Sequence, residues 1–290
     1  MREYNILYKL FFNRKGAKNA KGINNQLLIP YSLRSLRLCG YLFLLTSCGE
    51  ELMQQEIHTT TPIVESYLVE GTTNLSVKLY SMEVYLGEEY ILSQPIAGLS
   101  LKINDKELTE IGTGIYSLAL EEDTIRAGQE YNLQFEYNGK AVKASTFIPQ
   151  PVTGLKIEPE SITRTSFSYY WGMDSDTTQI FLSWDNPDNG FYQVYIDASN
   201  ASSSGFDTNF RKRVMQPIQA SSYTTSLREF RTAGIYFIYV YKVNKEYVEL
   251  YERVSSTDLA NPVSFIDNAL GIFTSMSVAG VRFTVYESEE

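Results

Sequence analysis

A cysteine near the amino terminus is the residue best placed for covalent chemistry. Cys48 follows the apolar run Leu38–Leu45 and two small residues, and two arginines precede the run. The run holds eight residues, whereas a helix needs about 20 apolar residues to cross a bilayer. Basic residues, a short apolar run and small residues before a cleavage point are the order of an export signal. The chain before Cys48 is therefore expected to be an export segment that is removed.

The string Leu45-Thr46-Ser47-Cys48 resembles the lipobox of bacterial lipoproteins, in which an aliphatic residue and two small residues precede the modified cysteine. The resemblance implies a signal peptide over residues 1–47 and a lipid anchor on Cys48. Residues 48–60 show no apolar period, which predicts a flexible polar tether. The alternative interpretation is a short buried helix with an incidental cysteine.

The charge of the chain changes at the same point. Residues 1–47 hold 8 of the 25 Lys and Arg but 1 of the 34 acids, which leaves a net charge of −16 on the rest. A protein with this negative charge repels the phosphate backbone of nucleic acid, so nucleic acid is not expected as a partner. It also repels anionic lipid headgroups, so basic patches cannot attach it to a membrane. The two cysteines are Cys39 and Cys48, so acylation of Cys48 leaves the mature chain without a disulfide. Core packing alone must then hold the folded part.

The residues that most catalytic sites need are missing from the sequence. His58, in the expected tether, is the only histidine, which argues against a His-dependent triad and a zinc site of several His or Cys ligands. No phosphate-binding glycine motif and no G-x-S-x-G string occurs. Asp185–Gly190 resembles a calcium loop only faintly, because Pro187 and Ile196 stand where an EF-hand needs ligands. Turn chemistry is the favoured interpretation there, with an irregular calcium site as the alternative. The sequence predicts no enzyme, no metal and no cofactor.

Aromatic residues supply the best candidates for binding. Tyr169, Tyr170 and Trp171 precede an acidic turn, and exposed rings there could stack on sugars or anchor a protein interface. The favoured alternative places them in a sandwich core and an edge strand. Trp184 is expected in the core. The basic run Arg211-Lys212-Arg213 is expected in a solvated loop, with docking of an acidic partner as the alternative.

Two-residue alternation and turn signals predict an all-β fold after Thr61. In the first region, residues 61–151, Asn138-Gly139 predicts a two-residue hairpin turn because both residue types accept positive φ angles. Short strands at this spacing are typical of a β-sandwich. Pro149-Gln150-Pro151 is expected to link this region to the next. The expected strands are Ile63–Val69, Leu75–Met82, Leu99–Ile103, Lys106–Ile111, Gly114–Leu120, Glu130–Tyr137 and Lys140–Ile148.

The second region, residues 152–290, is also expected to be a β domain. Gln179–Trp184, the Asn-Pro turn and Phe191–Ile196 follow an order that resembles the early hairpin of fibronectin type III-like sandwiches. Gly234–Val243 is apolar at both alternating positions, which predicts a central strand covered on both faces. The fold class is therefore predicted to be all-β, with two β-sandwich-like (immunoglobulin- or fibronectin III-like) regions. Further expectations are a Ser-rich loop at Ala198–Asp207, a short helix at Ser226–Arg231, a strand or helix at Tyr247–Val254 and a closing strand at Phe283–Tyr286.

Five segments carry a likeness to one family. They are Pro62–Gly71, Gly128–Leu133, Ile148-Pro149, Asn261-Pro262 and Asn268–Phe273. Together they resemble the lipoprotein family named domain of unknown function 4249, over nearly the whole mature chain. The resemblance implies an outer-membrane lipoprotein, often beside a TonB-dependent transporter, and it brings no catalytic residues.

These observations predict a non-catalytic, lipid-anchored binding or accessory protein of the outer membrane, on its periplasmic face or at the cell surface. A TonB-dependent transporter is the partner that the resemblance implies. One alternative is a structural or adhesive surface protein, such as a fimbria-like base subunit. Another is a glycan enzyme that uses two carboxylates, since a chain with this many acids always contains pairs.

Overall fold

The computed structural model describes residues 57–58, 61–84, 91–121, 123–164, 178–201, 212–230, 232–255 and 264–287. Residues 55–290 form one compact unit. The described residues are mostly strands, which confirms the all-β class. Among them, no helix has the length and apolar character to cross a membrane.

The elements are β1 (Ile57–His58), β2 (Ile63–Val69), β3 (Asn74–Val84), β4 (Ile91–Pro95), β5 (Lys102–Ile103), β6 (Lys106–Glu107), β7 (Thr109–Gly112), β8 (Ile115–Ala119), β9 (Glu130–Tyr137), β10 (Lys140–Phe147), β11 (Lys156–Glu158), β12 (Ser161–Arg164), β13 (Gln179–Ser183), β14 (Phe191–Ala201), β15 (Lys212–Val214), β16 (Ser222–Ser226), the 3-10 helix η2 (Leu227–Glu229), β17 (Gly234–Val243), α3 (Lys245–Ser255) and β18 (Leu270–Glu287).

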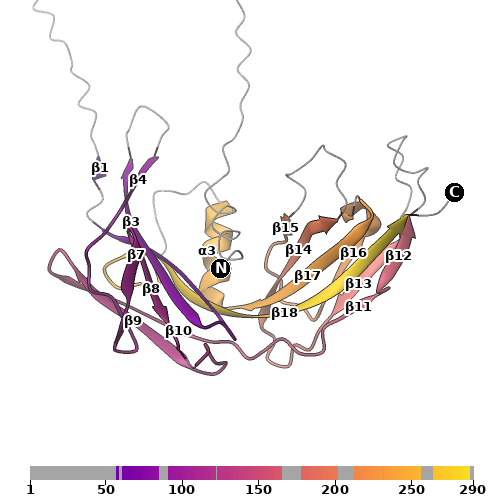
Figure 1. The fold of residues 1–290 in the computed structure, drawn as a ribbon, viewed down its shortest axis with the longest axis horizontal. Coiled ribbons are helices and arrows are strands. Elements are labelled where there is room, and N and C mark those ends of the chain that lie inside the picture. Colours follow the sequence, from indigo (N-terminus) through magenta and orange to yellow (C-terminus); the bar gives the residue numbers. More distant parts are fainter. Residues whose placement is uncertain are drawn as a thin grey trace, which may run out of the picture. The chain divides into compact units, whose positions relative to one another are not determined.

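The strands form one large sheet and two small ones (Figure 1). The large sheet has 11 strands and follows the order β15-β14-β17-β18-β2-β3-β8-β7, with β1 and β4 beside β3 and β12 beside β18. The small sheets have the orders β10-β9-β5-β6 and β11-β13-β16. The large sheet therefore joins strands from both predicted regions, residues 61–151 and 152–290.

Both small sheets cover the same face of the large sheet. Residues paired across neighbouring strands point to the same side, and the register of β18 places Val64 of β2 and Ile238 of β17 on one common face. Leu133 of the four-stranded sheet lies in the core that contains Val64. Leu182 of the three-stranded sheet lies in the core that contains Ile238. Two β-sandwich-like regions are thus confirmed, and they share one large sheet.

A single strand, β18, contributes to both cores. Its 18 residues pair in parallel with β2 at one end and with β12 at the other, and antiparallel with β17. Phe273 lies in the first core and Phe283 in the second. The sequence predicted only Phe283–Tyr286 as a strand, so this expectation was too short. The division into domains at Pro151 stays a prediction.

Gly271 explains why the start of β18 did not resemble a strand. Its φ angle is +94°, and a Cβ there would lie 2.1 Å from the carbonyl oxygen of Val64. Only glycine permits this close approach to β2. A glycine after Asn268 is typical of a loop in sequence, whereas here it lets two parallel strands meet.

Most local expectations are confirmed, with a few shifts. Asn138 and Gly139 both have positive φ, at 49° and 72°, as the hairpin turn requires. The segment 245–255 is a helix, α3, and η2 lies where a short helix was expected. β14 continues to Ala201, into the expected Ser-rich loop, because Ala201 pairs with Gly234 across a bulge. The expected strand Lys106–Ile111 is divided into β6 and β7.

Candidate functional site

Several residues predicted to be functional lie outside the described part of the chain. These are Leu45, Thr46, Ser47, Cys48, Tyr169, Tyr170 and Trp171. The expectations about acylation and about that aromatic cluster therefore stay predictions. Lys212 and Arg213 lie in β15, which pairs with β14, so the expectation of a loop was wrong at these two positions.

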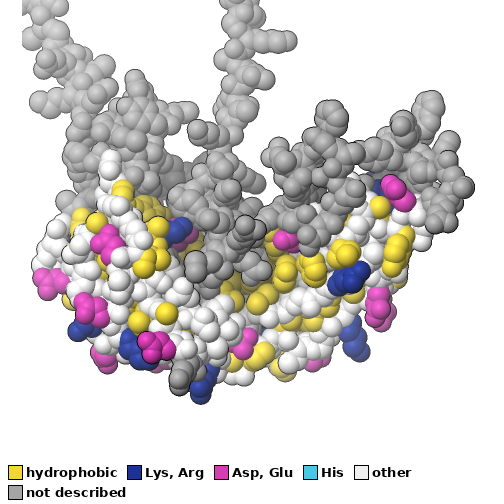
Figure 2. All heavy atoms as spheres, viewed as in Figure 1, with side chains coloured by type: hydrophobic (Ala, Val, Ile, Leu, Met, Phe, Trp, Pro, Cys, Tyr) yellow, Lys and Arg dark blue, Asp and Glu magenta, His cyan; other side chains and the backbone are white. Residues whose placement is uncertain are grey.

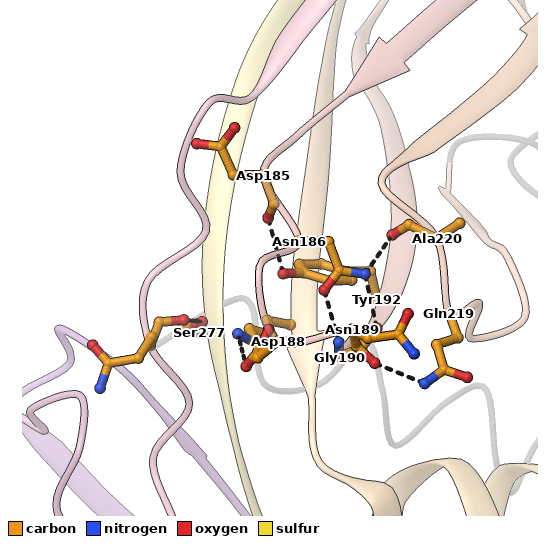
Figure 3. A network of polar contacts seen from close by, with 11 residues as sticks. Asp185, Asn186, Asp188, Asn189, Gly190, Tyr192, Gln219, Ala220 and Ser277 are labelled. Carbon is orange, nitrogen blue, oxygen red and sulfur yellow. Dashed lines mark hydrogen bonds and ion pairs between the residues drawn. The ribbon is translucent and has the colours of Figure 1, made fainter.

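The turn at Asp185–Gly190 is held by its own polar groups (Figure 3). The side-chain oxygen of Asn186 accepts a hydrogen bond from the backbone N–H of Gly190 at 2.7 Å. Its amide nitrogen donates to the carbonyl oxygens of Gly190 and Ala220, at 3.3 and 3.2 Å. Gln219 donates to the carbonyl oxygen of Asn189 at 2.7 Å. Asn186 thus links the turn to the chain before β16.

Both carboxylates of this turn have partners within the protein. Asp185 accepts from the hydroxyl of Thr153 at 2.9 Å, and Asp188 lies 2.6 Å from the ammonium of Lys242. The hydrogen bond from Lys242 lowers the pKa of Asp188. Burial, with the nearby Asp188 and Asp185 charges, raises the pKa of Tyr192 to about 12. These contacts support the turn interpretation.

Trp184, just before the turn, lies in the second core as expected. It is 4% exposed and its indole N–H donates to the carbonyl oxygen of Ala220 at 3.1 Å. Its ring centroid lies 5.3 Å from that of Tyr192. In the part of the chain that the structure describes, no cluster of three or more His, Cys, Asp or Glu could hold a metal.

The opposite face of the large sheet carries a row of aromatic rings. We call Tyr195, Phe237, Tyr239 and Tyr241 the aromatic face; the register of β14 and β17 places them on one side. The rings of Phe237 and Tyr239 lie 6.5 Å apart at 26°, and those of Tyr195 and Tyr239 lie 6.0 Å apart at 32°. Tyr241 continues the row, 6.4 Å from Tyr239. Figure 2 shows hydrophobic side chains gathered over β17 and β18.

The strand β18 pairs with β17 and lies beside these rings. Gly280 pairs with Tyr239 and is exposed, and a Cβ on it would lie 3.0 Å from two carbons of the Tyr239 ring. Glycine therefore lets the ring lie close over the backbone of β18. Arg282, the partner of Phe237 in the register, is exposed at the rim. Neither small sheet covers this face, since both pack on the other one.

The helix α3 limits the aromatic face at one end. The hydroxyl of Tyr247 donates to Gln193 at 2.7 Å, and the amide nitrogen of Gln193 donates to the carbonyl oxygen of Met215 at 3.0 Å. Burial raises the pKa of Tyr247 well above its usual value. The Tyr247 ring also meets that of Tyr67 edge to face. The helix is therefore attached to the same face of the sheet as the rings.

Sequence reasoning missed this site, although its signal was present in Gly234–Val243. The prediction was a strand covered on both faces. In the structure Tyr236, Ile238 and Val240 are buried, whereas Phe237, Tyr239 and Tyr241 are half-buried. The strand is central, between β14 and β18, as predicted. The aromatic character of one face, rather than its apolarity, was the informative feature.

Comparison with known proteins does not show a family for this chain. No family model matches the chain, and no curated protein does. Among solved structures, domains from titin are 12% identical, with 79% of this chain and 67% of that one covered at a TM-score of 0.22. The central fibronectin-III array of RIM-binding protein is 8% identical, with 79% and 70% covered at a TM-score of 0.23. Domains 4–9 of surface layer protein SbsC are 13% identical, with 80% and 32% covered at a TM-score of 0.22.

Proposed function

We propose that this protein is a non-catalytic, lipid-anchored binding or accessory protein of the outer membrane, and that the aromatic face binds its partner. The observation that carries the proposal is a row of rings, buried at Tyr195 and half-buried at Phe237, Tyr239 and Tyr241, on the sheet face that neither small sheet covers. Tyrosine and phenylalanine lose little side-chain entropy on binding and bury large apolar areas. Aromatic residues and arginine are also the types enriched in protein interfaces, and Arg282 lies at the rim.

The anchor determines where such a partner must be. Eight residues separate Cys48 from the start of β1 at Ile57, and an extended chain over this stretch spans at most about 30 Å. An acylated Cys48 would therefore hold the β-sandwiches close to the bilayer. A membrane protein of the same leaflet, such as the TonB-dependent transporter implied by the family resemblance, is within reach of that tether.

Affinity purification from detergent extracts tests the proposal. The wild-type protein is expected to enrich a TonB-dependent transporter, identified by mass spectrometry. The double variant Phe237→Thr, Tyr241→Thr should lose it, because threonine suits a strand but removes two rings. Phe181→Thr is the matched control, since Phe181 is 49% exposed on β13, away from this face.

Two outcomes of this affinity purification would contradict the proposal. If the double variant captures as much transporter as the wild type while all three proteins share the same far-UV circular dichroism, the aromatic face is not the binding surface. If none of the proteins enriches a transporter above an untagged control, the proposed partnership is wrong.

A further inference from the structure

A hollow separate from the aromatic face lies where the end of the four-stranded sheet meets the start of α3. We call it the Phe147 groove, and its volume is about 560 Å³. Binding sites for small molecules span about 300–1,000 Å³, so the groove is large enough to hold a small organic group. The side chains that decide its chemistry are Glu130, Phe147, Asn244, Lys245, Glu246 and Phe265.

The side-chain hydrogen-bond donors of the groove, Asn244 and Lys245, already have acceptors within the protein. The amide of Asn244 donates to the hydroxyl of Thr146, to the carbonyl oxygen of Phe147 and to the hydroxyl of Ser275, at 3.1, 3.1 and 3.0 Å. The ammonium of Lys245 lies 3.3 Å from the carboxylate of Glu249, one helical turn further on. A ligand rich in acceptors would therefore compete with existing bonds.

Acceptors and aromatic rings remain available. Glu130 is exposed and stands directly opposite Phe147 in the register of β9 and β10. Among the described residues, none forms a hydrogen bond or ion pair with its carboxylate. The Oε1 atom of Glu246 accepts from Thr274 at 2.9 Å, and its Oε2 atom has no such bond within the described part. The ring of Phe147 is 55% exposed, and Phe265 is half-buried.

We propose that the Phe147 groove binds an organic cation, and that the guanidinium of an arginine on a partner polypeptide is its occupant. Carboxylates form their strongest hydrogen bonds with cationic donors, and a planar guanidinium also stacks on an aromatic ring. The charge of −16 that follows residue 47 raises the local concentration of cations. The groove is thus complementary to a planar cation, both in its carboxylates and in its rings.

Fluorescence anisotropy with the full-length protein in detergent micelles tests this site. The probe is a dye-labelled Gly-Arg-Gly peptide, and the matched peptide carries citrulline, which keeps the shape of arginine but has no charge. The arginine peptide is expected to bind at least about tenfold more tightly, as two charge-assisted hydrogen bonds would produce. Raising the salt concentration should weaken only the arginine peptide.

Two pairs of variants localise the binding. Glu130→Gln should weaken the arginine peptide about threefold to tenfold, whereas Glu136→Gln, on the same exposed face of β9, should not. Phe147→Leu should weaken it about threefold through loss of the ring, whereas Phe181→Leu should not. Both Phe147 and Phe181 are exposed, so these changes are tolerated by the fold.

Competition with agmatine, a free guanidinium compound, distinguishes an arginine on a polypeptide from a free small-molecule cation. Agmatine that displaces the peptide only at much higher concentration supports a polypeptide partner, and displacement at equal concentration overturns that choice of occupant. Equal affinity for arginine and citrulline peptides, or equal losses in Glu130→Gln and Glu136→Gln, overturns the site itself. The groove variants leave the aromatic face intact, so transporter capture and cation binding can fail separately.

Discussion

At the scale of single residues, Gly280 lets the ring of Tyr239 lie close to the backbone of the neighbouring strand. A ring that lies over the backbone of a neighbouring strand needs glycine beneath it. The contact also explains why the exposed middle of β18 has no side chain at Gly280.

Gly280→Ala should therefore weaken transporter capture without unfolding the protein. The added Cβ would lie 3.0 Å from the Tyr239 ring and must displace it. Strand propensities span about 1 kcal/mol, so the free energy of unfolding should change by no more than that. Affinity purification and urea denaturation measure the two quantities. Gly112→Ala is the control, because its nearest contact is an ordinary 3.7 Å; equal capture by both variants would contradict the prediction.

Glu65 is a buried acid whose charge opposes folding. Its side chain is 7% exposed, and its Oε2 atom has no hydrogen-bond partner. Burial raises its pKa, and the charge of Lys78, 3.9 Å away, partly opposes this shift. Because the folded-state pKa lies above the unfolded value, the penalty is present at neutral pH. It disappears as pH falls below the unfolded value of about 4.3.

Glu65→Gln is expected to raise the free energy of unfolding at pH 7 by about 1 kcal/mol, since it removes a buried charge of which one oxygen is unsatisfied. Below about pH 4 both side chains are neutral, so the difference should vanish. Urea denaturation at several pH values measures it, with the exposed Glu136→Gln as the control. A variant less stable than wild type at pH 7 would show that the Lys78 pair outweighs desolvation.

At the scale of elements, β18 is the strand that connects the two cores. It carries Phe273 into one and Phe283 into the other, and its hydrogen bonds reach β2, β12 and β17. Ser277 within it donates to the carbonyl oxygen of Gln150 at 2.8 Å, which ties the proline-flanked segment to the large sheet. That segment therefore packs against β18 as well as joining two sheets.

Phe273→Ala should destabilise the second core as well as the first. Phe273 is 1% exposed in the first core, and removing a buried phenylalanine costs about 3–5 kcal/mol. Trp184 reports on the second core, and its fluorescence can be followed in a Trp171→Phe background, because the chain has 2 tryptophans. We expect the Trp184 transition to shift to lower urea. An unchanged transition would mean that the two regions unfold independently.

At the scale of the whole molecule, one large sheet carries two small sheets on the same face. This arrangement buries both cores on one side and leaves the aromatic face on the other. The aromatic face and the second core thus use opposite faces of the same strands, β14, β17 and β18. Lipid anchoring would add the remaining condition, a position near the membrane.

Cys48→Ala should release the protein from membranes. Without the thiol there is no site for the lipid, and the body after residue 47, with its net charge of −16, has no other attraction to anionic lipids. Fractionation of cell extracts measures the distribution, and intact-mass spectrometry of the wild type should show an acylated amino-terminal cysteine. A Cys48→Ala protein that still sediments with membranes would contradict lipid anchoring.

Local patterns predicted many of the strands from the sequence alone. The bounds of β2, β9 and β17 were predicted to the residue, since alternation, β-branched residues and turn signals act within a few positions. The hairpin at Asn138-Gly139 follows from residues that accept positive φ. Where a distant partner decides the conformation, the prediction failed, as at Gly271 and in the last residues of β14.

The candidate sites depended on the tertiary structure. Alternation indicates which residues of one strand share a face, but it does not indicate what covers that face. The pairing of β14, β17 and β18 decided that Phe237 and Tyr239 stay half-buried while Tyr236 and Ile238 enter a core. The Phe147 groove likewise joins residues more than a hundred positions apart. The sequence determined the strands whose pattern is local and the alternation of their side chains, whereas long-range pairing decided the remaining strands and which side of each strand met a core.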